Sequence, residues 1–115
     1  MFSDTPFNYD ISGWDVSHVT DMHDMFKYTI FNHDISGWDV SNVVDMEEMF
    51  AYSYFNQDIS GWDVSNVTNM TGMFNNNKKF NQDISKWDVS NVDEYWDIFY
   101  LCLIKEKYKP EKFKN

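Results

Sequence analysis

The sequence predicts a repeat solenoid, in which coils of similar sequence stack on one another and a helix caps the C-terminal end. Nearly the same sequence occurs four times, beginning at Phe7, Phe31, Phe55 and Phe80. The spacing between the starts of successive copies is therefore 24, 24 and 25 residues. Apolar residues are kept from copy to copy while their polar neighbours vary, which indicates a shared interior. One coil of this length buries too little apolar surface to be stable alone, whereas stacked coils bury it against each other.

Within one copy the pattern changes character, so each coil is predicted to contain two short strands and one helical turn. Between Ile59 and Val67 the apolar residues are interrupted by Gly, Asp and Asn, which favour turns. This stretch therefore predicts two extended segments joined by a corner. Met70, Met73 and Phe74 follow at the i, i+3, i+4 spacing of a single helical turn.

The apolar residues that recur at equivalent positions are the predicted core. They are Trp14, Trp38, Trp62, Trp87, Met22, Met46, Met70, Phe26, Phe50, Phe74 and Phe99. A ligand channel or a methionine metal site would be an alternative use of these columns, but packing is favoured because Met and aromatic side chains fill interiors well. Each buried indole N–H would then need an acceptor, and we expect a backbone carbonyl of the next coil to serve.

The two ends depart from the repeat, which divides the chain into a cap at 1–6, four coils at 7–99, and a capping helix with a basic tail at 100–115. Phe2 and Pro6 are expected to cover the first coil. In the last copy a longer apolar run over 93–104 replaces the usual turn, which predicts a helix that Pro110 stops.

The phrase over residues 55–74, Phe-Asn-Gln-Asp-Ile-Ser-x-Trp-Asp-Val-Ser-Asn-Val-Thr-x-Met-x-x-Met-Phe, resembles a repeat of mycoplasma surface lipoproteins that is related to the BspA-type leucine-rich repeats. The resemblance covers residues 7–99 and implies right-handed leucine-rich-repeat-like or β-solenoid coils. It also implies a role in attachment or recognition at the cell surface or outside the cell. The chain shows no signal peptide and no lipid-attachment cysteine, and it lacks the L-x-x-L-x-L-x-x-N pattern, so an exact horseshoe is not expected.

Composition limits the possible partners. The chain is 43% hydrophobic and 19% aromatic, which favours folding over disorder, and its formal net charge is −10. An acidic body repels phosphate, so nucleic acid and anionic membranes are poor partners. No apolar run is long enough to cross a bilayer. The single cysteine, Cys102, excludes an internal disulfide.

Three polar ladders recur in the repeat, one of amides and two of carboxylates. They are Asn8, Asn32, Asn56 and Asn81; Asp10, Asp34, Asp58 and Asp83; and Asp15, Asp39, Asp63 and Asp88. Stacked carboxylates could hold Ca²⁺, which would make the protein a calcium-stabilised module. The favoured interpretation is that each Asp closes a turn by accepting from amides near the following Ser. Stacked Asn side chains are expected to bond between coils. No cofactor and no metal is predicted.

Nothing in the sequence predicts catalysis. His18, His23 and His33 fall at three different positions of the repeat, so they form no recurring site. The Ser residues have no recurring His partner, and Cys102 is expected to pack in the cap. The chain is therefore predicted not to be an enzyme.

Loops that vary between copies are the best guide to function, because repeat proteins commonly bind through such loops. Tyr28, Tyr52 and Tyr54 lie in these loops and are the predicted partner-binding residues. The leading hypothesis is a module that binds a protein or a glycan and belongs to a surface or assembly-forming protein. The alternative is a purely structural subunit of a larger assembly, with no ligand of its own.

Overall fold

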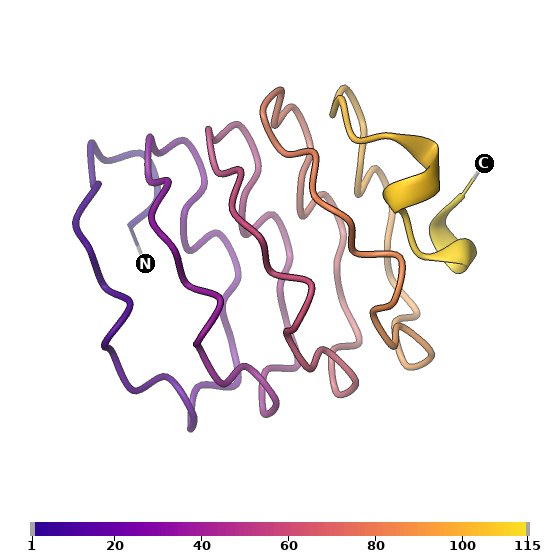
Figure 1. Cartoon of the computed structure of the whole chain (residues 1–115), viewed down its shortest axis with the longest axis horizontal. Coiled ribbons are helices and arrows are strands. Elements are labelled where there is room, and N and C mark those ends of the chain that lie inside the picture. Colours follow the sequence, from indigo (N-terminus) through magenta and orange to yellow (C-terminus); the bar gives the residue numbers. More distant parts are fainter. Residues whose placement is uncertain (1, 115) are drawn as a thin grey trace.

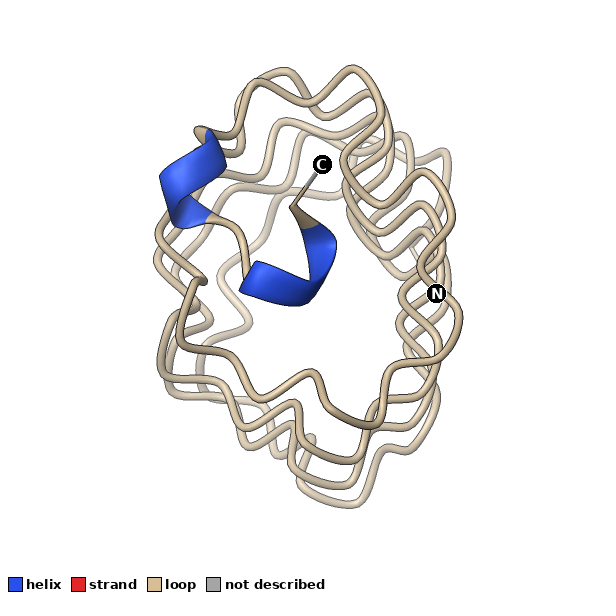
Figure 2. Cartoon of the chain, turned by 90° about the vertical axis from the view of Figure 1, so that its right-hand side faces the viewer, coloured by secondary structure: helices blue, strands red, loops and turns tan. Residues whose placement is uncertain are grey.

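The computed structural model describes residues 2–114, which wind into successive turns that lie side by side along the longest axis (Figure 1). The molecule measures 34 × 28 × 20 Å. Each turn carries one copy of the repeat, and we call residues 7–30, 31–54, 55–79 and 80–103 copies 1 to 4. Seen end on, the copies overlie one another (Figure 2), and the two termini lie at opposite ends of the stack.

The predicted elements are wrong. Residues 2–114 contain no α-helix and no β-sheet, and the regular elements are two 3-10 helices, η1 (Glu106–Tyr108) and η2 (Glu111–Phe113). The fold class predicted from the sequence, a repeat solenoid of right-handed leucine-rich-repeat-like or β-solenoid coils with two strands and a helical turn each, is therefore overturned. The prediction of leucine-rich-repeat-like coils is therefore wrong as well. The turns consist of irregular backbone.

The expected helical turn does not form because its amides alternate between two kinds of acceptor. In copy 2 the N–H groups of Met46, Glu48, Phe50 and Tyr52 donate to carbonyls of copy 3 at 2.8–2.9 Å. The intervening N–H of Met49 donates back to the Met46 carbonyl at 3.2 Å. A helix would need consecutive amides to donate within the segment. Positive φ angles of 53° at Glu48 and 54° at Tyr52 also interrupt the right-handed backbone.

The expected strands shrink to one bridge per junction. Parallel bridges join Asp21 to Asp45, Asp45 to Asn69 and Asn69 to Glu94. Elsewhere the backbone closes tight turns within its own copy. In copy 2 the Trp38 N–H donates to Ile35 at 3.1 Å and the Val43 N–H to Val40 at 3.0 Å. Because these groups bond locally, they are not available to extend a ladder to the neighbouring copy.

The predicted C-terminal capping helix is also absent from the described residues. Residues 93–102 instead continue the stack, since the Met70 N–H donates to Glu94 at 2.8 Å and the Phe74 N–H to Ile98 at 2.9 Å. After this segment η1 and η2 lie across the end of the stack (Figure 2). There the Phe113 ring packs 4.9 Å from the Tyr95 ring and 6.3 Å from the Phe99 ring. The two 3-10 helices therefore cover the C-terminal end of the stack, which is the role that the sequence assigned to a single capping helix.

Phenylalanine rings form the centre of the core in two adjoining columns. Neighbouring rings of one column lie 5.6–5.9 Å apart from Phe2 through Phe26, Phe50 and Phe74 to Phe99. The second column contains Phe7, Phe31, Phe55 and Phe80 at 5.9–6.4 Å. Rings of the two columns stack at 4.1–4.3 Å within each junction, as for Phe50 and Phe55. The rings are close to parallel, so each ring packs by offset stacking against its neighbours.

The predicted tryptophan column is buried in copies 2 to 4. Trp38, Trp62 and Trp87 are 4–5% exposed, and each indole N–H donates to an Ile carbonyl at 3.0–3.1 Å. The acceptor lies in the preceding copy and not in the next one. Met22, Met46, Met70, Phe26, Phe50 and Phe74 are likewise buried.

Two predicted core residues differ from the rest because they lie at the ends. Trp14 is 46% exposed, so its assignment to the core is wrong. Within residues 2–114 its indole N–H has no counterpart of the Ile carbonyl that accepts from each later Trp. Phe99 is partly buried and lies beneath Phe113 at the C-terminal end.

The predicted N-terminal cap is the closing part of one more copy. The Phe2 N–H donates to Met25 and the Asp4 N–H to Lys27, both at 2.8 Å, as the equivalent Phe26 N–H donates to Met49. Asp4 has a φ of 57°, close to that of 58° at Tyr28. Residues 1 and 115, which belong to the predicted cap and tail, lie outside the described residues.

Candidate interaction edge

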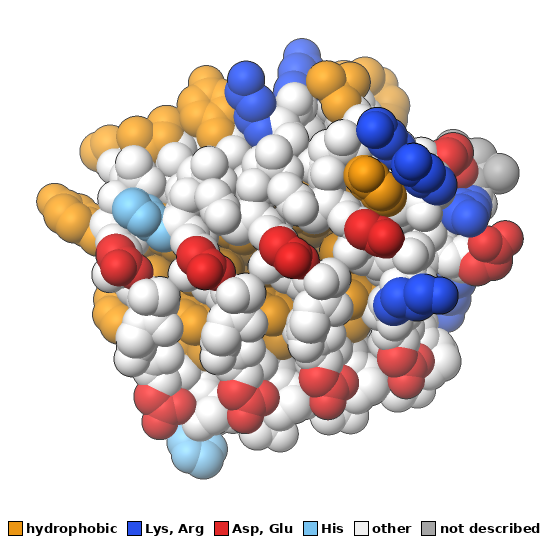
Figure 3. Space-filling view, viewed as in Figure 1, with side chains coloured by type: hydrophobic (Ala, Val, Ile, Leu, Met, Phe, Trp, Pro, Cys, Tyr) orange, Lys and Arg blue, Asp and Glu red, His pale blue; other side chains and the backbone are white. Residues whose placement is uncertain are grey.

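Four large side chains lie exposed where copies 1 and 2 end. Tyr28 and Ile30 follow Phe26, and Tyr52 and Tyr54 follow Phe50; their exposed fractions lie between 41% and 56%. We call these four residues the aromatic edge. Figure 3 shows hydrophobic side chains gathered along one edge of the stack, with basic side chains beside them. Three of the four residues are those predicted from sequence as partner-binding, and the structure adds Ile30.

Tyr28 and Tyr52 form a stacked pair. Their ring centroids are 4.6 Å apart and their planes differ by 17°. Both residues have positive φ, of 58° and 54°, which costs about 1–2 kcal/mol for a residue with a Cβ. Their amides donate to Ala51 at 3.1 Å and to Asn75 at 2.8 Å, which holds this backbone in place. The two rings are thus ordered before any partner arrives.

A charged pair lies beside this stack. Lys27 forms an ion pair with Glu48 of the next copy, and its Nζ lies 5.5 Å from the centre of the Tyr28 ring. The hydrogen bond to Glu48 raises the pKa of Lys27. The Lys27 ammonium is therefore held against the aromatic edge by a carboxylate of copy 2.

The edge changes chemistry along the stack. In copy 3 Asn76 takes the position of Tyr28 and Tyr52, with a φ of 58°, and the exposed Lys78 and Lys79 follow it. In copy 4 the edge is continued by Leu101 and Leu103, at 53% and 69% exposure. The extra residue of copy 3 is accommodated by buried Asn77, whose Oδ1 accepts from the Lys79 and Phe80 amides at 3.0 Å. An aromatic section is thus followed by a basic and then an aliphatic one.

An acidic face adjoins this edge and shows two rows of carboxylates (Figure 3). In each row the Asp accepts from the Ser two residues later; Asp63, for example, accepts from the Ser65 N–H at 3.0 Å and from its hydroxyl at 2.6 Å. These hydrogen bonds, those from the Ser65 side chain first, lower the pKa of Asp63. The same Asp to Ser contact recurs in all four copies. The prediction that Asp closes turns is confirmed.

Asparagine side chains link the copies, as predicted. Oδ1 of Asn32 accepts from the Asn56 N–H at 2.8 Å, and Oδ1 of Asn56 accepts from the Asn81 N–H at 3.0 Å. A second series was not predicted: Nδ2 of Asn42, Asn66 and Asn91 donates to a Ser carbonyl of the preceding copy at 2.7 Å. The sequence did contain a signal for this second series, because Asn recurs before the last Val of the phrase Asp-Val-Ser-Asn-Val in copies 2 to 4. Both series join neighbouring copies of the stack.

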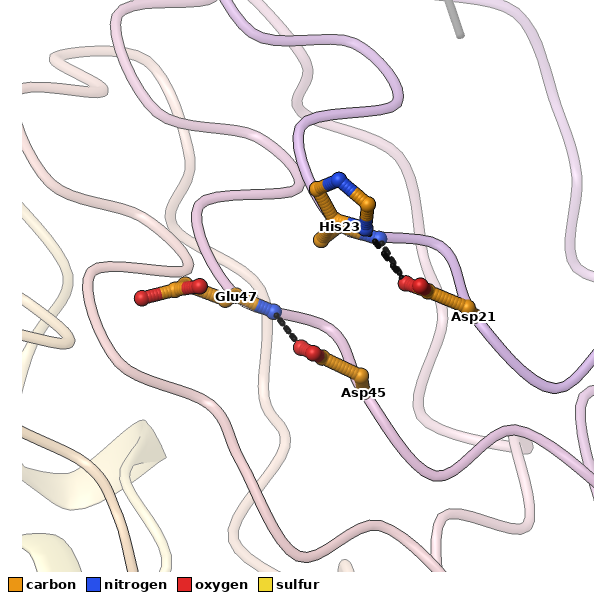
Figure 4. A network of polar contacts seen from close by, with 4 residues as sticks. All are labelled: Asp21, His23, Asp45 and Glu47. Atoms are coloured by element: carbon orange, nitrogen blue, oxygen red, sulfur yellow. Dashed lines mark hydrogen bonds and ion pairs between the residues drawn. The ribbon is translucent and has the colours of Figure 1, made fainter.

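One cluster combines carboxylates with a histidine at the junction of copies 1 and 2 (Figure 4). Oδ1 of Asp21 accepts from the His23 N–H at 3.0 Å and lies 2.6 Å from its Nδ1, and ligand-type atoms of Asp21, His23 and Asp45 lie within 4.8 Å of one another. This cluster was missed from the sequence because the repeat positions of the three histidines were compared only with each other, whereas Asp45 comes from the next copy.

Turn closure explains this cluster as well. Asn69, at the same position of copy 3, makes the same bond, since its Oδ1 accepts from the Thr71 N–H at 2.9 Å. A neutral amide thus replaces the carboxylate without loss of the turn. The hydrogen bond to Asp21 raises the pKa of His23, and burial, followed by repulsion from Asp45, raises the pKa of Glu47.

The remaining histidines and the cysteine lie apart. His18 and His33 belong to different parts of copies 1 and 2, and Nε2 of His33 lies 2.9 Å from the Asn8 carbonyl. The Cys102 thiol is partly buried beside the Phe80 carbonyl, and burial raises its pKa. A raised pKa keeps a thiol protonated and unreactive.

Two open clefts lie at the ends of the stack. The cleft at the C-terminal end has a volume of about 580 Å³ and is lined by Tyr95, Trp96, Lys112 and Phe113 among others. The cleft at the N-terminal end, of about 590 Å³, is lined by Trp14, Val16, Val19 and Met22 with polar neighbours. The C-terminal cleft lies between copy 4 and the residues around η2, and the N-terminal cleft lies against copy 1.

A family model described as "Mycoplasma protein of unknown function, DUF285" matches residues 1–108. No curated protein and no solved structure matches the chain. Within residues 2–114 neither 3-10 helix has the length or apolar character needed to cross a membrane.

Proposed function

Because the chain belongs to the family described as Mycoplasma protein of unknown function, DUF285, and presents an ordered aromatic edge, we propose that it is a non-enzymatic interaction module that binds a protein partner. The aromatic edge, Tyr28, Ile30, Tyr52 and Tyr54, makes the contact. The basic and aliphatic sections in copies 3 and 4 extend it along the stack.

The stacked pair of Tyr28 and Tyr52 is the observation that carries the proposal. Aromatic anchors contribute most to protein interfaces when little entropy is lost on binding. Here both rings are already held, by each other at 4.6 Å and by backbone hydrogen bonds at both residues. The exposed Ile30 and Tyr54 beside them add apolar area that a partner can bury.

The same geometry favours a protein over a glycan. A sugar ring commonly packs on the open face of an aromatic ring. In this pair the rings lie face to face with an angle of 17° between planes, so each covers one face of the other. Each ring therefore offers a sugar one face fewer, whereas the edges and hydroxyls of both rings remain for contact with apolar and hydrogen-bonding side chains.

We further propose that the protein acts at the cell surface and that its repeat is related to the BspA-type surface proteins. The support is the phrase over residues 55–74, which resembles the repeat of mycoplasma surface lipoproteins. The leucine-rich-repeat geometry is not part of this proposal.

A second candidate function is a structural subunit of a larger assembly. The exposure of Trp96 and Leu103 near the C-terminal end, at 78% and 69%, favours it. Light scattering after size-exclusion chromatography distinguishes the candidates, because a monodisperse monomer at high concentration contradicts an obligate assembly subunit.

The proposed function is tested with labelled protein on mammalian epithelial cells. We expect saturable binding that protease treatment of the cells removes and glycosidase treatment leaves intact. Tyr28→Ala with Tyr52→Ala should reduce this binding at least about tenfold, the effect of a typical hot-spot pair. Tyr9→Ala is the matched control, because Tyr9 is 74% exposed and lies outside the edge. Equal loss in both variants, or loss on glycosidase treatment, would contradict the proposal.

A further inference from the structure

The edge of the stack carries one basic section between two apolar ones. The aromatic edge of copies 1 and 2 is followed by Lys78 and Lys79, the basic section, and then by Leu101 and Leu103, the aliphatic section. Figure 3 shows basic side chains between two groups of hydrophobic side chains along this edge. A partner that follows the stack therefore meets three kinds of surface in a fixed order.

Backbone hydrogen bonds join the three sections. Asn76, which takes the place of Tyr28 and Tyr52 in copy 3, donates its N–H to the Tyr100 carbonyl of copy 4 at 2.7 Å. Leu101 takes the same place in copy 4, with a φ of 56°. The aliphatic section is therefore ordered by the same kind of backbone bond that holds the two tyrosines.

The loop that carries the basic section is fixed from inside. Asn77 is fully buried, its Oδ1 accepts from the Lys79 and Phe80 amides at 3.0 Å, and its Nδ2 donates to the Phe55 carbonyl at 3.1 Å. The side chains of Lys78 and Lys79 are exposed, and neither ammonium group forms an ion pair within residues 2–114. The basic section thus offers two cations that no carboxylate of the described chain neutralises.

Charge complementarity calls for an anionic side chain opposite the basic section. Two unpaired ammonium groups attract a carboxylate of a partner and repel a cation. A polyanion is a poor occupant, because the chain has a net charge of −10 and the adjoining face carries two rows of carboxylates (Figure 3). The occupant is therefore an isolated acidic residue with apolar residues on both sides, which match the aromatic and aliphatic sections.

The spacing of the sections fits an extended peptide that runs along the stack. The Tyr28 and Tyr52 rings of successive copies lie 4.6 Å apart. At about 5 Å per copy, the centre of the aromatic edge is roughly 7 Å from the basic section, which is about 5 Å from the aliphatic section. In an extended strand, alternate side chains face the same side at about 6.6 Å. Three alternate residues therefore reach the three sections together.

We propose that this edge binds an extended segment of a protein partner with the pattern apolar-x-acidic-x-apolar. The inference rests on the proposed function, since it names the chemistry of the partner that the aromatic edge contacts. The first apolar residue packs on the aromatic edge, the carboxylate pairs with Lys78 or Lys79, and the second apolar residue packs on Leu101 and Leu103. The pattern reads the same from both ends, so the segment can run in either direction.

Selection from a random 12-residue peptide library displayed on phage, with the full chain immobilised, tests this pattern. The selected peptides should share an Asp or Glu that has an apolar residue two positions away on each side. The variant Lys78→Glu with Lys79→Glu should instead select Lys or Arg at the central position. A peptide selected on the unmodified chain should bind this variant at least about tenfold more weakly in fluorescence anisotropy, because like charges then face each other.

The matched control is Lys86→Glu with Lys107→Glu, which reverses the same charge at two exposed lysines outside the edge. It should bind the selected peptide like the unmodified chain. An unchanged thermal midpoint in both double variants checks that they fold.

Four results would overturn the inference. They are a library without an enriched pattern, a central residue that stays acidic in the charge-reversed variant, equal weakening in the control, and membrane binding through the edge. The last is measured by sedimentation with vesicles of phosphatidylglycerol and phosphatidylcholine, and vesicle binding that Lys78→Glu with Lys79→Glu abolishes would make anionic lipid the occupant. The loss of cell binding in Tyr28→Ala with Tyr52→Ala tests the proposed function by itself, so a failure of the acidic pattern is distinguished from a failure of the edge.

Discussion

Each copy is joined to the next in two regions that use different chemistry. In the backbone-bonded region, residues 20–29 and their equivalents, main-chain amides of one copy donate to carbonyls of the next, as Phe50 does to Met73 at 2.8 Å. In the side-chain-bonded region, residues 8–18 and their equivalents, side chains of Asn, Gln, His and Trp make the bonds between copies. Asn56 accepting from Asn81 and Trp62 donating to Ile35 are examples.

This difference explains which residues repeat. Where side chains make the bonds, the phrase Asp-Ile-Ser-x-Trp-Asp-Val-Ser returns in every copy, because each polar residue has a specific partner. Where the backbone makes the bonds, exposed side chains can vary, and the position of His23 holds Glu47, Thr71 and Trp96 in later copies. Tyr28 and Tyr52 of the aromatic edge lie in this variable region, and Ile30 and Tyr54 lie directly after it. The stack can therefore change its surface there without loss of its junctions.

The largest effect is expected from removing a tryptophan of the side-chain-bonded region. Trp62→Ala deletes a side chain that is 4% exposed together with its bond to Ile35, and should lower the free energy of unfolding by about 3–5 kcal/mol. Trp14→Ala, at a side chain 46% exposed, should cost less than about 2 kcal/mol. Denaturant unfolding measures both. Equal losses would mean that burial by a preceding copy is not what distinguishes them.

Removing one asparagine link should have the next largest effect. Asn56→Ala leaves the Asn81 amide without its acceptor and removes one of the two acceptors of Gln82 Nε2, which should cost about 1–3 kcal/mol. The control is Asn8→Ala, since Asn8 accepts from the Asn32 N–H at a long 3.4 Å. An Asn56→Ala variant as stable as its control would show that the asparagine ladder contributes little.

The two regions should respond differently when a glycine is replaced by alanine, because only one of the two glycines compared has a positive φ. Gly72 in the backbone-bonded region has a φ of +61°, and a Cβ there would lie 3.0 Å from Glu48 Cγ; Gly72→Ala should therefore cost about 1–2 kcal/mol. At Gly61 in the side-chain-bonded region a Cβ would meet nothing within 4 Å, so Gly61→Ala should change stability by less than about 0.5 kcal/mol. Thermal melting compares them, and a reversed order would contradict the assigned backbone.

Acidification should weaken the side-chain-bonded region. Hydrogen bonds from Ser65, led by its side chain, lower the pKa of Asp63 from its ordinary value of 3.8, and the other turn-closing carboxylates shift the same way. The unfolded chain then binds more protons just below pH 4, so stability is fully present above that pH and is lost as the pH falls through the lower folded-state pKa values. Asp63→Asn should reduce the pH dependence of the thermal midpoint, and an unchanged dependence would contradict the cause given.

Chelation should have the smallest effect. The carboxylates of both rows already accept from Ser, so we expect EDTA to leave the thermal midpoint unchanged. A fall in the midpoint that calcium reverses would instead support the calcium-stabilised alternative.

Much of the organisation could be predicted from the sequence, because burial imposes one residue type on each interior position. The Phe columns and the buried Trp38, Trp62 and Trp87 follow from the alignment of copies, and turn closure by Asp follows from its local chemistry. The helical turn did not follow, since the i, i+3, i+4 spacing of Met70, Met73 and Phe74 also fits tight turns that alternate with bonds to the next copy. Spacing reports which side chains face inward but not where the amides donate.

Some signals were present but were not used. The start of the chain, Met-Phe-Ser-Asp-Thr-Pro-Phe-Asn, matches Met-Phe-Lys-Tyr-Thr-Ile-Phe-Asn at residues 25–32, and this match predicts the partial copy that Phe2 begins. The stacking of Tyr28 on Tyr52 depends on positive φ angles at two non-glycine residues, which no residue preference indicates. Ile30 was missed because only aromatic residues were considered as anchors.

Hydrogen exchange at single amides tests the two-region account most directly. In Asn56→Ala, the account predicts that the Asn81 amide loses its protection while the Phe50 and Phe74 amides, which donate to backbone carbonyls at 2.8 and 2.9 Å, keep theirs. Uniform loss at all three amides, or an Asn81 amide protected as in the unmodified chain, would contradict it.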